Sequence, residues 1–333
     1  MVFKMRYSGI GGQAVMEGVM MKNQDKYAVA VRKPDHEIVV EVSEYSGIMK
    51  DKKIKNMPIF RGVFNFIDSL VLGMKTLTFS ASFFEEEAEV EKKEQLSEEE
   101  KKKQEQKEKK QEQKEKKQES AMMGGTMALS VVLAVGIFML LPYYISTFFG
   151  KFIPSGWLMA LLEGVIRLAI FVGYVAAISM MKDIRRVYMY HGAEHKCINC
   201  IEHGMELNVE NVRKSSRLHK RCGTSFLLIV MLISIVFFMF IRVDSPVLKV
   251  VLRVLLVPVI AGVSYEFIRL AGRSDNAVVN LLSKPGLWLQ GLTTREPDDE
   301  MIEVGIASVE AVFDWKPYVE EIQREMDRER RDR

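Results

Sequence analysis

The sequence predicts a mainly α-helical fold: a polytopic membrane bundle of about four transmembrane helices, preceded by a small N-terminal β-containing cytoplasmic region. Of the 333 residues, 48% are hydrophobic and 27% are charged, which taken alone would suit a soluble protein. The charge is concentrated, however, because residues 85–119 hold 14 Glu and 11 Lys. The remainder contains several apolar runs of the roughly 20 residues that a helix needs to cross a bilayer. The chain is therefore not expected to be a soluble single-domain protein.

Composition argues against two other classes of protein. The net charge is only +3, and the Lys-rich stretches lack interleaved aromatic residues, so nucleic acid is not an expected partner. All three cysteines lie between residues 197 and 222, which does not suit the disulfide framework of a small secreted protein. The opening string MVFKMRYSGIGGQ contains no apolar core of signal-peptide length.

Residues 1–59 are expected to form a glycine-rich loop followed by a β-hairpin. Residues 27–32 and 38–43 are rich in β-forming side chains and are separated by the turn-forming string KPDH. Residues 9–18 read GIGGQAVMEG and are expected to form a turn, whose Glu17 could offer a carboxylate to a site beneath it. The string lacks the Lys-Ser/Thr ending of a phosphate-binding loop.

Residues 60–84 are apolar but carry polar side chains at regular intervals. Arg61, Asp68 and Lys75 are seven residues apart, so they share one face of a helix. An amphipathic helix on the cytoplasmic membrane interface is the favoured interpretation, and a packed helix whose polar face lines a cavity is the alternative. Residues 85–120 have almost nothing to bury and are expected to form a charged Glu/Lys/Gln linker.

Four transmembrane helices are expected within residues 121–294. The apolar runs are 127–150, 157–181, 225–241 and 247–270. The cytoplasmic assignment comes from the loop 182–224, which contains nine Lys or Arg, whereas the two short connections are poor in charge. Both termini are then cytoplasmic too. The chain is expected to be a multi-pass protein of the cell membrane, with the lipid bilayer as its partner and self-association into a homo-oligomer left open.

The C-terminal residues 295–333 are expected to form a polar tail. A short helical pattern spans residues 301–312, and a charged run covers residues 320–333. Neither feature predicts a ligand, so this run is expected to be solvated.

The string HGAEH at residues 191–195 carries the clearest chemical signal. In a helix, His191 and His195 lie one turn apart on one face, which lets two imidazoles bind the same metal ion. With Glu194 beside them, the string fits H-x-x-E-H, in which two His bind zinc and the Glu activates water. The alternative is a pair of hydrogen-bonded histidines with a structural role.

Further candidate metal ligands are expected on the same side of the membrane. His219 and Cys222 precede the third apolar run, and Glu266 lies near the cytoplasmic end of the fourth. An ionisable residue at that depth should have a partner or a function. Glu266 is therefore a candidate oxygen ligand, as is Glu17, while a salt bridge to Arg269 or Arg273 in the same helix is the alternative for Glu266.

The cysteines allow a different kind of site. Cys197 and Cys200 form the single C-x-x-C of the chain, and with Cys222 and a histidine they could supply the four ligands of a structural zinc site. The simpler interpretation of Cys197 and Cys200 is two small buried thiols.

Five strings taken together resemble a known family. They are GGQAVMEGVMM at 11–21, HGAEHK at 191–196, RCGTSFLLIV at 221–230, SYEFIRLAGR at 264–273 and PGLWLQGLTTREPDD at 285–299. Over nearly its whole length, apart from the charged segment, the chain resembles the YqhQ-like bacterial membrane proteins, a family of unknown function commonly described as metal-dependent enzymes. It departs from the family pattern at Cys197, which is usually Thr, and at Lys220, which is usually Pro. The first departure argues against an essential C-x-x-C, whereas Cys200, His219 and Cys222 match.

The sequence therefore predicts a metal-dependent enzyme, for which hydrolysis is the natural class of reaction. A divalent ion, expected to be zinc, would be held by His191 and His195 with an oxygen ligand, and Glu194 would be the general base. The alternatives are a non-catalytic membrane scaffold with a structural metal and an ion or solute transport component. The pattern does not specify a substrate.

Overall fold

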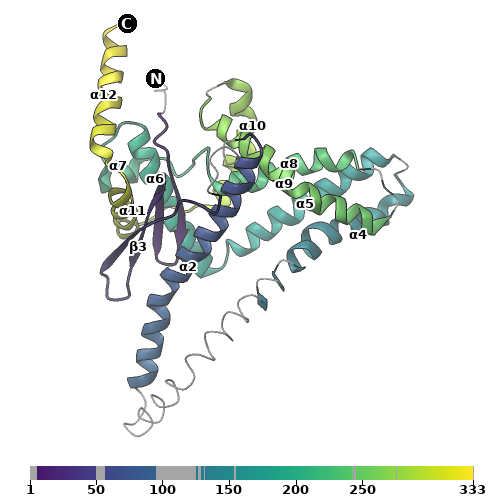
Figure 1. Cartoon of the computed structure of the whole chain (residues 1–333), viewed down its shortest axis with the longest axis horizontal. Coiled ribbons are helices and arrows are strands. Elements are labelled where there is room, and N and C mark those ends of the chain that lie inside the picture. The colour runs from purple at the N-terminus through teal and green to yellow at the C-terminus, as the bar shows by residue number, and fades with distance from the viewer. Residues whose placement is uncertain are drawn as a thin grey trace. The chain divides into compact units, whose positions relative to one another are not determined.

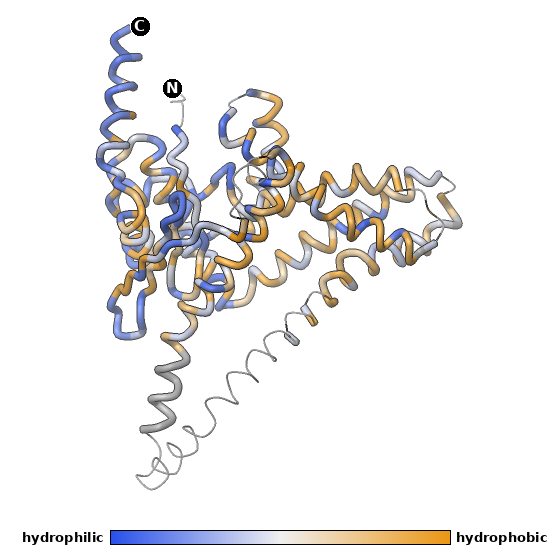
Figure 2. Tube along the Cα trace, viewed as in Figure 1, coloured by the Kyte–Doolittle hydropathy of each residue, from blue (hydrophilic) through white to orange (hydrophobic). Residues whose placement is uncertain are grey.

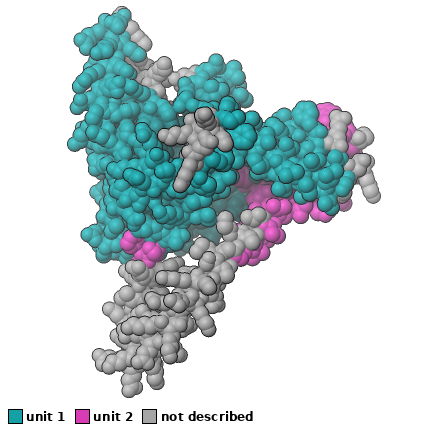
Figure 3. Space-filling model, viewed as in Figure 1, with its two compact units in different colours: residues 1–81, 172–333 teal, residues 82–171 magenta. Residues whose placement is uncertain are grey.

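A computed structural model describes most of the chain. It covers residues 6–49, 57–94, 125–126, 129–130, 132–153, 155–241, 243, 245–274 and 276–332. The fold is mainly helical with an N-terminal antiparallel sheet (Figure 1). The chain divides into two compact units, residues 1–81 with 172–333 and residues 82–171 (Figure 3). Within the predicted charged linker, residues 95–120 lie outside the described part of the chain.

The N-terminal region is a four-stranded sheet in the order β1-β2-β3-β4. The strands are β1 (Ile10–Val15), β2 (Gly18–Asn23), β3 (Lys26–Arg32) and β4 (Ile38–Glu44). The predicted hairpin is confirmed as β3 and β4, but the predicted glycine-rich turn forms a second hairpin. Only Met16 and Glu17 turn, Glu17 with a φ of 49°. A Cβ at Gly18 would lie 2.4 Å from the Ala30 carbonyl oxygen, so this glycine permits close strand pairing and is not a loop signal.

One face of the sheet packs against α6 (Lys182–Glu202) and α11 (Asp299–Val312) (Figure 1). Val19, Ala28 and Ala30 of the sheet share a buried cluster with Ile198 and Ile302. The segment expected to be a polar tail therefore contains a core helix, because its apolar residues recur on one face. After α11, α12 (Trp315–Arg331) also buries one side of its first turns.

On the opposite face of the sheet, Gly73 of α2 (Phe60–Glu94) lies against the Gln13 side chain, and Lys75 lies over the Tyr27 ring. The helix is ten residues longer than predicted. The polar stripe of this helix partly faces protein. The Asp68 carboxylate accepts hydrogen bonds from the Tyr45 hydroxyl at 3.1 Å and the Ile48 backbone N–H at 2.8 Å. Ser80 is fully buried and accepts from the Met16 backbone N–H at 3.2 Å. Large apolar side chains are exposed elsewhere on α2, at Ile67, Leu70, Val71, Met74 and Leu77. Its place at a membrane interface stays a prediction.

Among the described residues, two helices are long and apolar enough to cross a membrane: α5 (Gly156–Ile178) and α9 (Pro246–Ala271). The other two predicted spans are shorter apolar helices, so a four-span bundle is not confirmed. The first, residues 132–148, includes the π-helical turn η1 (Gly136–Leu140) and α4 (Leu141–Phe148), and a 3-10 turn η2 (Phe149–Lys151) follows it. The other, α8 (Gly223–Met239), has 17 residues. Figure 2 shows the hydrophobic character of α8 and α9.

The long connection predicted between the second and third spans is itself largely helical. After α5, extended backbone at Met181 starts the separate helix α6, and α7 (Val209–Lys214) follows. The sequence did not predict α10 (Ala277–Thr293), which contains Pro285 and packs against α8. Helix α10 holds the loop between α7 and α8 in place. This loop brings Cys222 next to α6.

Candidate metal centre

Helix α6 runs beneath strand β1 and is attached to the N-terminal region at three levels. Near its start, Arg186 forms an ion pair with Glu17. In the middle, Gly12 lies against the Glu194 carboxylate, because a Cβ on Gly12 would be only 2.7 to 2.8 Å from its atoms. At its end, Glu202 accepts a hydrogen bond from the Ser8 backbone N–H at 2.9 Å. The helix is continuous through these levels, so its histidines are held on one face.

His191, His195 and Cys222 form the one cluster of potential metal ligands found among the described residues. Their ligand atoms all lie within 4.8 Å of one another, and the two imidazole centroids are 4.4 Å apart. The predicted histidine pair is thus brought together as expected for a helix. Cys222, which the sequence also offered as a candidate ligand, brings a thiol from a different element, since it caps the N-terminus of α8.

The buried amide of Gln290 in α10 positions the loop that carries Cys222. Its Oε1 accepts from the His219 backbone N–H at 2.9 Å, and its Nε2 donates to the His219 carbonyl at 2.7 Å. The same Nε2 donates to the Ser225 hydroxyl at 2.6 Å. Three hydrogen bonds from one side chain therefore tie α10 to both sides of Cys222.

Backbone carbonyls orient both histidines. Nδ1 of His191 lies 2.9 Å from the Thr293 carbonyl oxygen, and Nδ1 of His195 lies 2.6 Å from that of Arg217. A carbonyl oxygen only accepts, so each Nδ1 carries the proton and each Nε2 is left to bind an ion. Carbonyl support of the second ring nitrogen is the usual arrangement around metal-bound histidines. Two imidazoles and one thiol, so arranged, fit a zinc-type ion.

The charges within the cluster support a thiolate. Burial alone would raise the pKa of Cys222, but His191 and His195 outweigh it and hold this pKa well below its usual value. Burial would lower the pKa of His191, but the Cys222 thiolate and Glu194 raise it to about 9. The Cys222 Sγ lies 3.3 Å from His191 Nε2. A cation bound between this sulfur and this nitrogen would take the place of a proton there.

Glu194 adjoins the cluster without belonging to it. Its Oε2 lies 3.9 Å from His191 Nε2, and the residue is 5% exposed. Burial raises the pKa of this carboxyl above its ordinary value, against the opposing effect of the two histidines. A carboxylate at this position, close to the ligands but outside their group, has the placement that a general base requires.

The structure does not bring the other predicted ligands into the cluster. Glu266 is bound by the Arg61 guanidinium through both of its oxygens, with Arg269 farther away at 3.9 Å. Glu17 is bound by Arg186. In each case the carboxylate forms an ion pair with an arginine from another element. Neither residue therefore supplies the expected oxygen ligand to the cluster.

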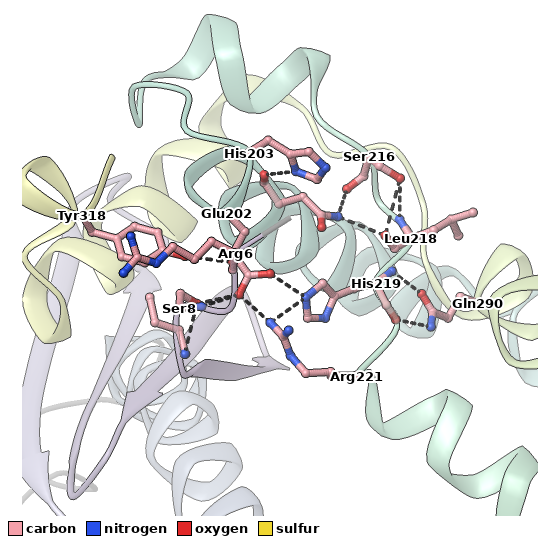
Figure 4. A network of polar contacts seen from close by, with 12 residues as sticks. Arg6, Ser8, Glu202, His203, Ser216, Leu218, His219, Arg221, Gln290 and Tyr318 are labelled. Atoms are coloured by element: carbon pink, nitrogen blue, oxygen red, sulfur yellow. Dashed lines mark hydrogen bonds and ion pairs between the residues drawn. The ribbon is translucent and has the colours of Figure 1, made fainter. Parts of the chain in front are cut away.

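His219 is also outside the cluster, in a buried network around Glu202 (Figure 4). Its ring centroid is 5.6 Å from that of His195, and its Nε2 lies 3.1 Å from Arg221 Nη2 and 3.5 Å from Glu202 Oε2. Arg221 also donates to Glu202, whose other donors are the backbone N–H and hydroxyl of Ser8. Burial would raise the pKa of Glu202, but His219 and Arg221 lower it to about 2.

The C-x-x-C does not complete a four-ligand zinc site with Cys222. Both thiols are buried, and the metal cluster described above includes neither. Burial raises the pKa of Cys197, whose Sγ lies 2.9 Å from where a Cβ on Gly305 would be, and it raises the pKa of Cys200 to about 11. Cys200 Sγ donates weakly to the Glu206 carbonyl at 3.4 Å. These are packed, protonated thiols between α6 and its neighbours.

Sequence reasoning missed three contributors to the site. Gly12 was taken as part of a turn, and Gln290 was not among the candidate residues. Only Glu202 had a usable signal: it follows His195 by seven residues, so a longer predicted helix would have placed both on one face.

Comparisons with known proteins identify relatives but no established function. The family model described as "Protein of unknown function (DUF1385)" matches residues 57–315. The "Uncharacterized protein YqhQ" of Bacillus subtilis (strain 168) is 34% identical over 303 residues, which cover 90% of each chain. No solved structure matches.

Proposed function

The chain belongs to the DUF1385 family, whose function is unknown, and from its site we propose that it is a membrane-associated, metal-dependent hydrolase. One observation carries the proposal: two histidines and one cysteine converge within 4.8 Å, with a buried glutamate next to them that is not one of the three. Structural zinc sites usually have four protein ligands, whereas catalytic sites have three and leave a position open. The arrangement is thus the catalytic type.

The proposed mechanism uses three residues as metal ligands and a fourth as the general base. His191, His195 and Cys222 would hold the ion. When bound, such an ion acts as a Lewis acid and makes water nucleophilic near neutral pH. Glu194 would take the proton from that water and return it to the leaving group. Its burial and raised pKa suit this role, because a base with a pKa nearer neutrality also serves as the acid.

The first test is the metal content of purified full-length protein. His195→Ala should lose its metal, because removing one of three ligands sharply weakens the site. Cys197→Thr is the matched control: it alters a neighbouring buried residue of the same helix and should keep the metal of the wild type. Full metal occupancy in His195→Ala would refute the ligand assignment.

We further propose that the chain crosses the cell membrane four times with both termini in the cytoplasm. The two long apolar helices support this, together with nine basic residues in the connection between α5 and α8. In this arrangement the candidate metal centre faces the cytoplasm, where thiols stay reduced.

Cysteine labelling in intact cells tests the topology. Lys214→Cys should resist a thiol reagent that cannot cross the membrane, whereas Phe152→Cys, at a side chain that is 78% exposed, should react. The wild-type chain is the background control, since its three cysteines are buried. Labelling of position 214 with position 152 protected would reverse the proposed orientation.

A second function is favoured by one contact. Cys222 Sγ lies 3.3 Å from His191 Nε2 and accepts from the Thr224 backbone N–H at 3.4 Å, an arrangement that also suits a cysteine nucleophile activated by a histidine. Chelation separates the two: a metal-dependent enzyme loses its activity with its ion, whereas a thiol enzyme retains it. A scaffold or a transport component would instead show no hydrolysis, whether the protein holds its metal or has lost it to the chelator.

A further inference from the structure

Strand β1 is an edge strand of the sheet, because β2 is the one strand that pairs with it in the part of the chain that the structure describes. Its register with β2 runs from Ile10 opposite Asn23 to Val15 opposite Gly18, closed by a two-residue turn. In an antiparallel ladder, residues alternate between bonding to the partner strand and pointing away from it. The two-residue turn closes on the hydrogen-bonded pair Val15 and Gly18. The backbone groups of Ile10, Gly12 and Ala14 therefore point outward.

The contacts at the two ends of β1 agree with this alternation. The outward N–H of Ile10 donates to the Ser8 hydroxyl at 3.2 Å, and that of Met16 donates to Ser80. Between these two ends, the outward backbone N–H groups of Gly12 and Ala14 have no acceptor in the described part of the chain. Gly11 and Gly12 are both exposed. With respect to the described residues, the middle of this edge is therefore open.

The open stretch lies directly beside the candidate general base. Gly12 is in contact with the Glu194 carboxylate, which any larger residue at this position would displace. An added strand would lie about 4.8 Å from β1. The residue of such a strand that pairs with Gly12 would then be a neighbour of Glu194, and through it of His191.

The two edge strands of the sheet, β1 and β4, differ in whether they carry charged side chains. Proteins protect exposed edges with charged side chains. The outer edge strand β4 carries Glu41 and Glu44, both exposed, whereas β1, with the sequence IGGQAV, has no charged residue. On the face of the sheet at Gly11, a Cβ would meet no described atom within 4 Å.

We propose that the substrate is an extended polypeptide segment that adds to the free edge of β1 as a fifth strand. The inference rests on the proposed hydrolase function and names its substrate class. Backbone hydrogen bonds would give affinity, as in other cases of strand addition. In the reaction, the water oxygen bonds to the peptide carbonyl carbon and the C–N bond breaks. Glu194 carries a water proton to the leaving nitrogen, so the products are a carboxylic acid and an amine.

Two proline variants test the edge in full-length, metal-loaded protein. Proline lacks an N–H but is tolerated at sheet edges. Ala14→Pro removes an outward N–H from β1, and Val42→Pro does the same on the opposite edge at β4. Incubation with a proteome-derived peptide library, with new termini identified by mass spectrometry, should show cleavage by the wild type and by Val42→Pro. Ala14→Pro should be slower by about tenfold, the effect of one hydrogen bond, with unchanged metal content.

Binding supplies a second measurement that does not depend on the folding of a β1 variant. Peptides that the wild type cleaves are synthesised with alternate backbone nitrogens methylated and titrated into Glu194→Gln protein. Methylation of one alternate set should weaken binding about tenfold or more, and methylation of the other set should not, because only one set faces β1.

The outcomes separate this inference from the function on which it rests. Equal effects of the two methylated sets, or wild-type protein that holds its metal yet cleaves no peptide, would overturn the polypeptide inference and leave the metal site standing. Peptide cleavage that persists in metal-free protein would overturn the proposed metal-dependent function instead.

Discussion

Glu194→Gln should retain the metal and the fold but fail to restore whatever phenotype a deletion strain shows. Glutamine preserves the volume and the contact with Gly12, but it cannot accept a proton from water, and loss of a general base lowers rates by about 10² to 10⁴-fold. Complementation paired with elemental analysis measures both effects. Asp298→Asn, at the N-cap of α11, is a suitable control for a change of carboxylate to amide elsewhere in the same unit.

Each other result for Glu194→Gln has a definite meaning. A protein with metal affinity lowered by about 10 to 100-fold, and function regained in excess metal, would make Glu194 a support for a histidine and not the base. A metal-replete variant that complements fully would refute the hydrolase mechanism and favour a structural metal or a transport role.

Glu202→Ala should cause the largest loss of stability among substitutions near the site. Glu202 has no exposed surface and is the carboxylate partner of Arg221, so its removal leaves a largely buried guanidinium without a carboxylate to balance its charge. Breaking such a pair costs about 3 kcal/mol or more, which lowers the melting temperature by roughly 6 °C or more. Because the folded state lowers the pKa of Glu202 from 4.5 to about 2, its contribution is complete above pH 4.5 and is lost as the pH falls towards 2.

The matched control is Glu210→Ala on α7. Its carboxylate also pairs with a basic side chain, Lys214, but both are exposed, and surface pairs contribute little. Thermal unfolding of the two variants in the same detergent should differ clearly. Equal melting temperatures would show that the Glu202 network does not stabilise the fold.

The periodic patterns of the sequence predicted the features that depend on residues close together in the chain. The pair His191 and His195 needed only a helix through residues 188–196, and α6 provides it. The hairpin of β3 and β4 likewise followed from alternation around a turn. The glycines of β1 and β2 hid the other hairpin, because glycine is a turn signal in sequence whereas here Gly12 and Gly18 permit close contacts.

The remaining ligands depended on tertiary contacts that no local pattern encodes. Cys222, Glu17 and Glu266 were equally good candidates by residue type, and arginines from distant elements decided among them. Arg61 and Arg186 bind the two carboxylates, whereas Gln290 holds the loop that places Cys222 against His191. The helix α11 was missed as a core element because its polar flanks dominate the composition of the C-terminal segment.

The donor set of two histidines and one thiolate is tested most directly by the absorption spectrum of cobalt-substituted protein. Wild-type protein should show a thiolate-to-cobalt charge-transfer band with the visible absorption of a four-coordinate ion. Cys222→Ser should lose the charge-transfer band, and Cys200→Ser should keep it. A band that persists unchanged in Cys222→Ser, or wild-type protein that binds no cobalt, would contradict the proposed metal centre.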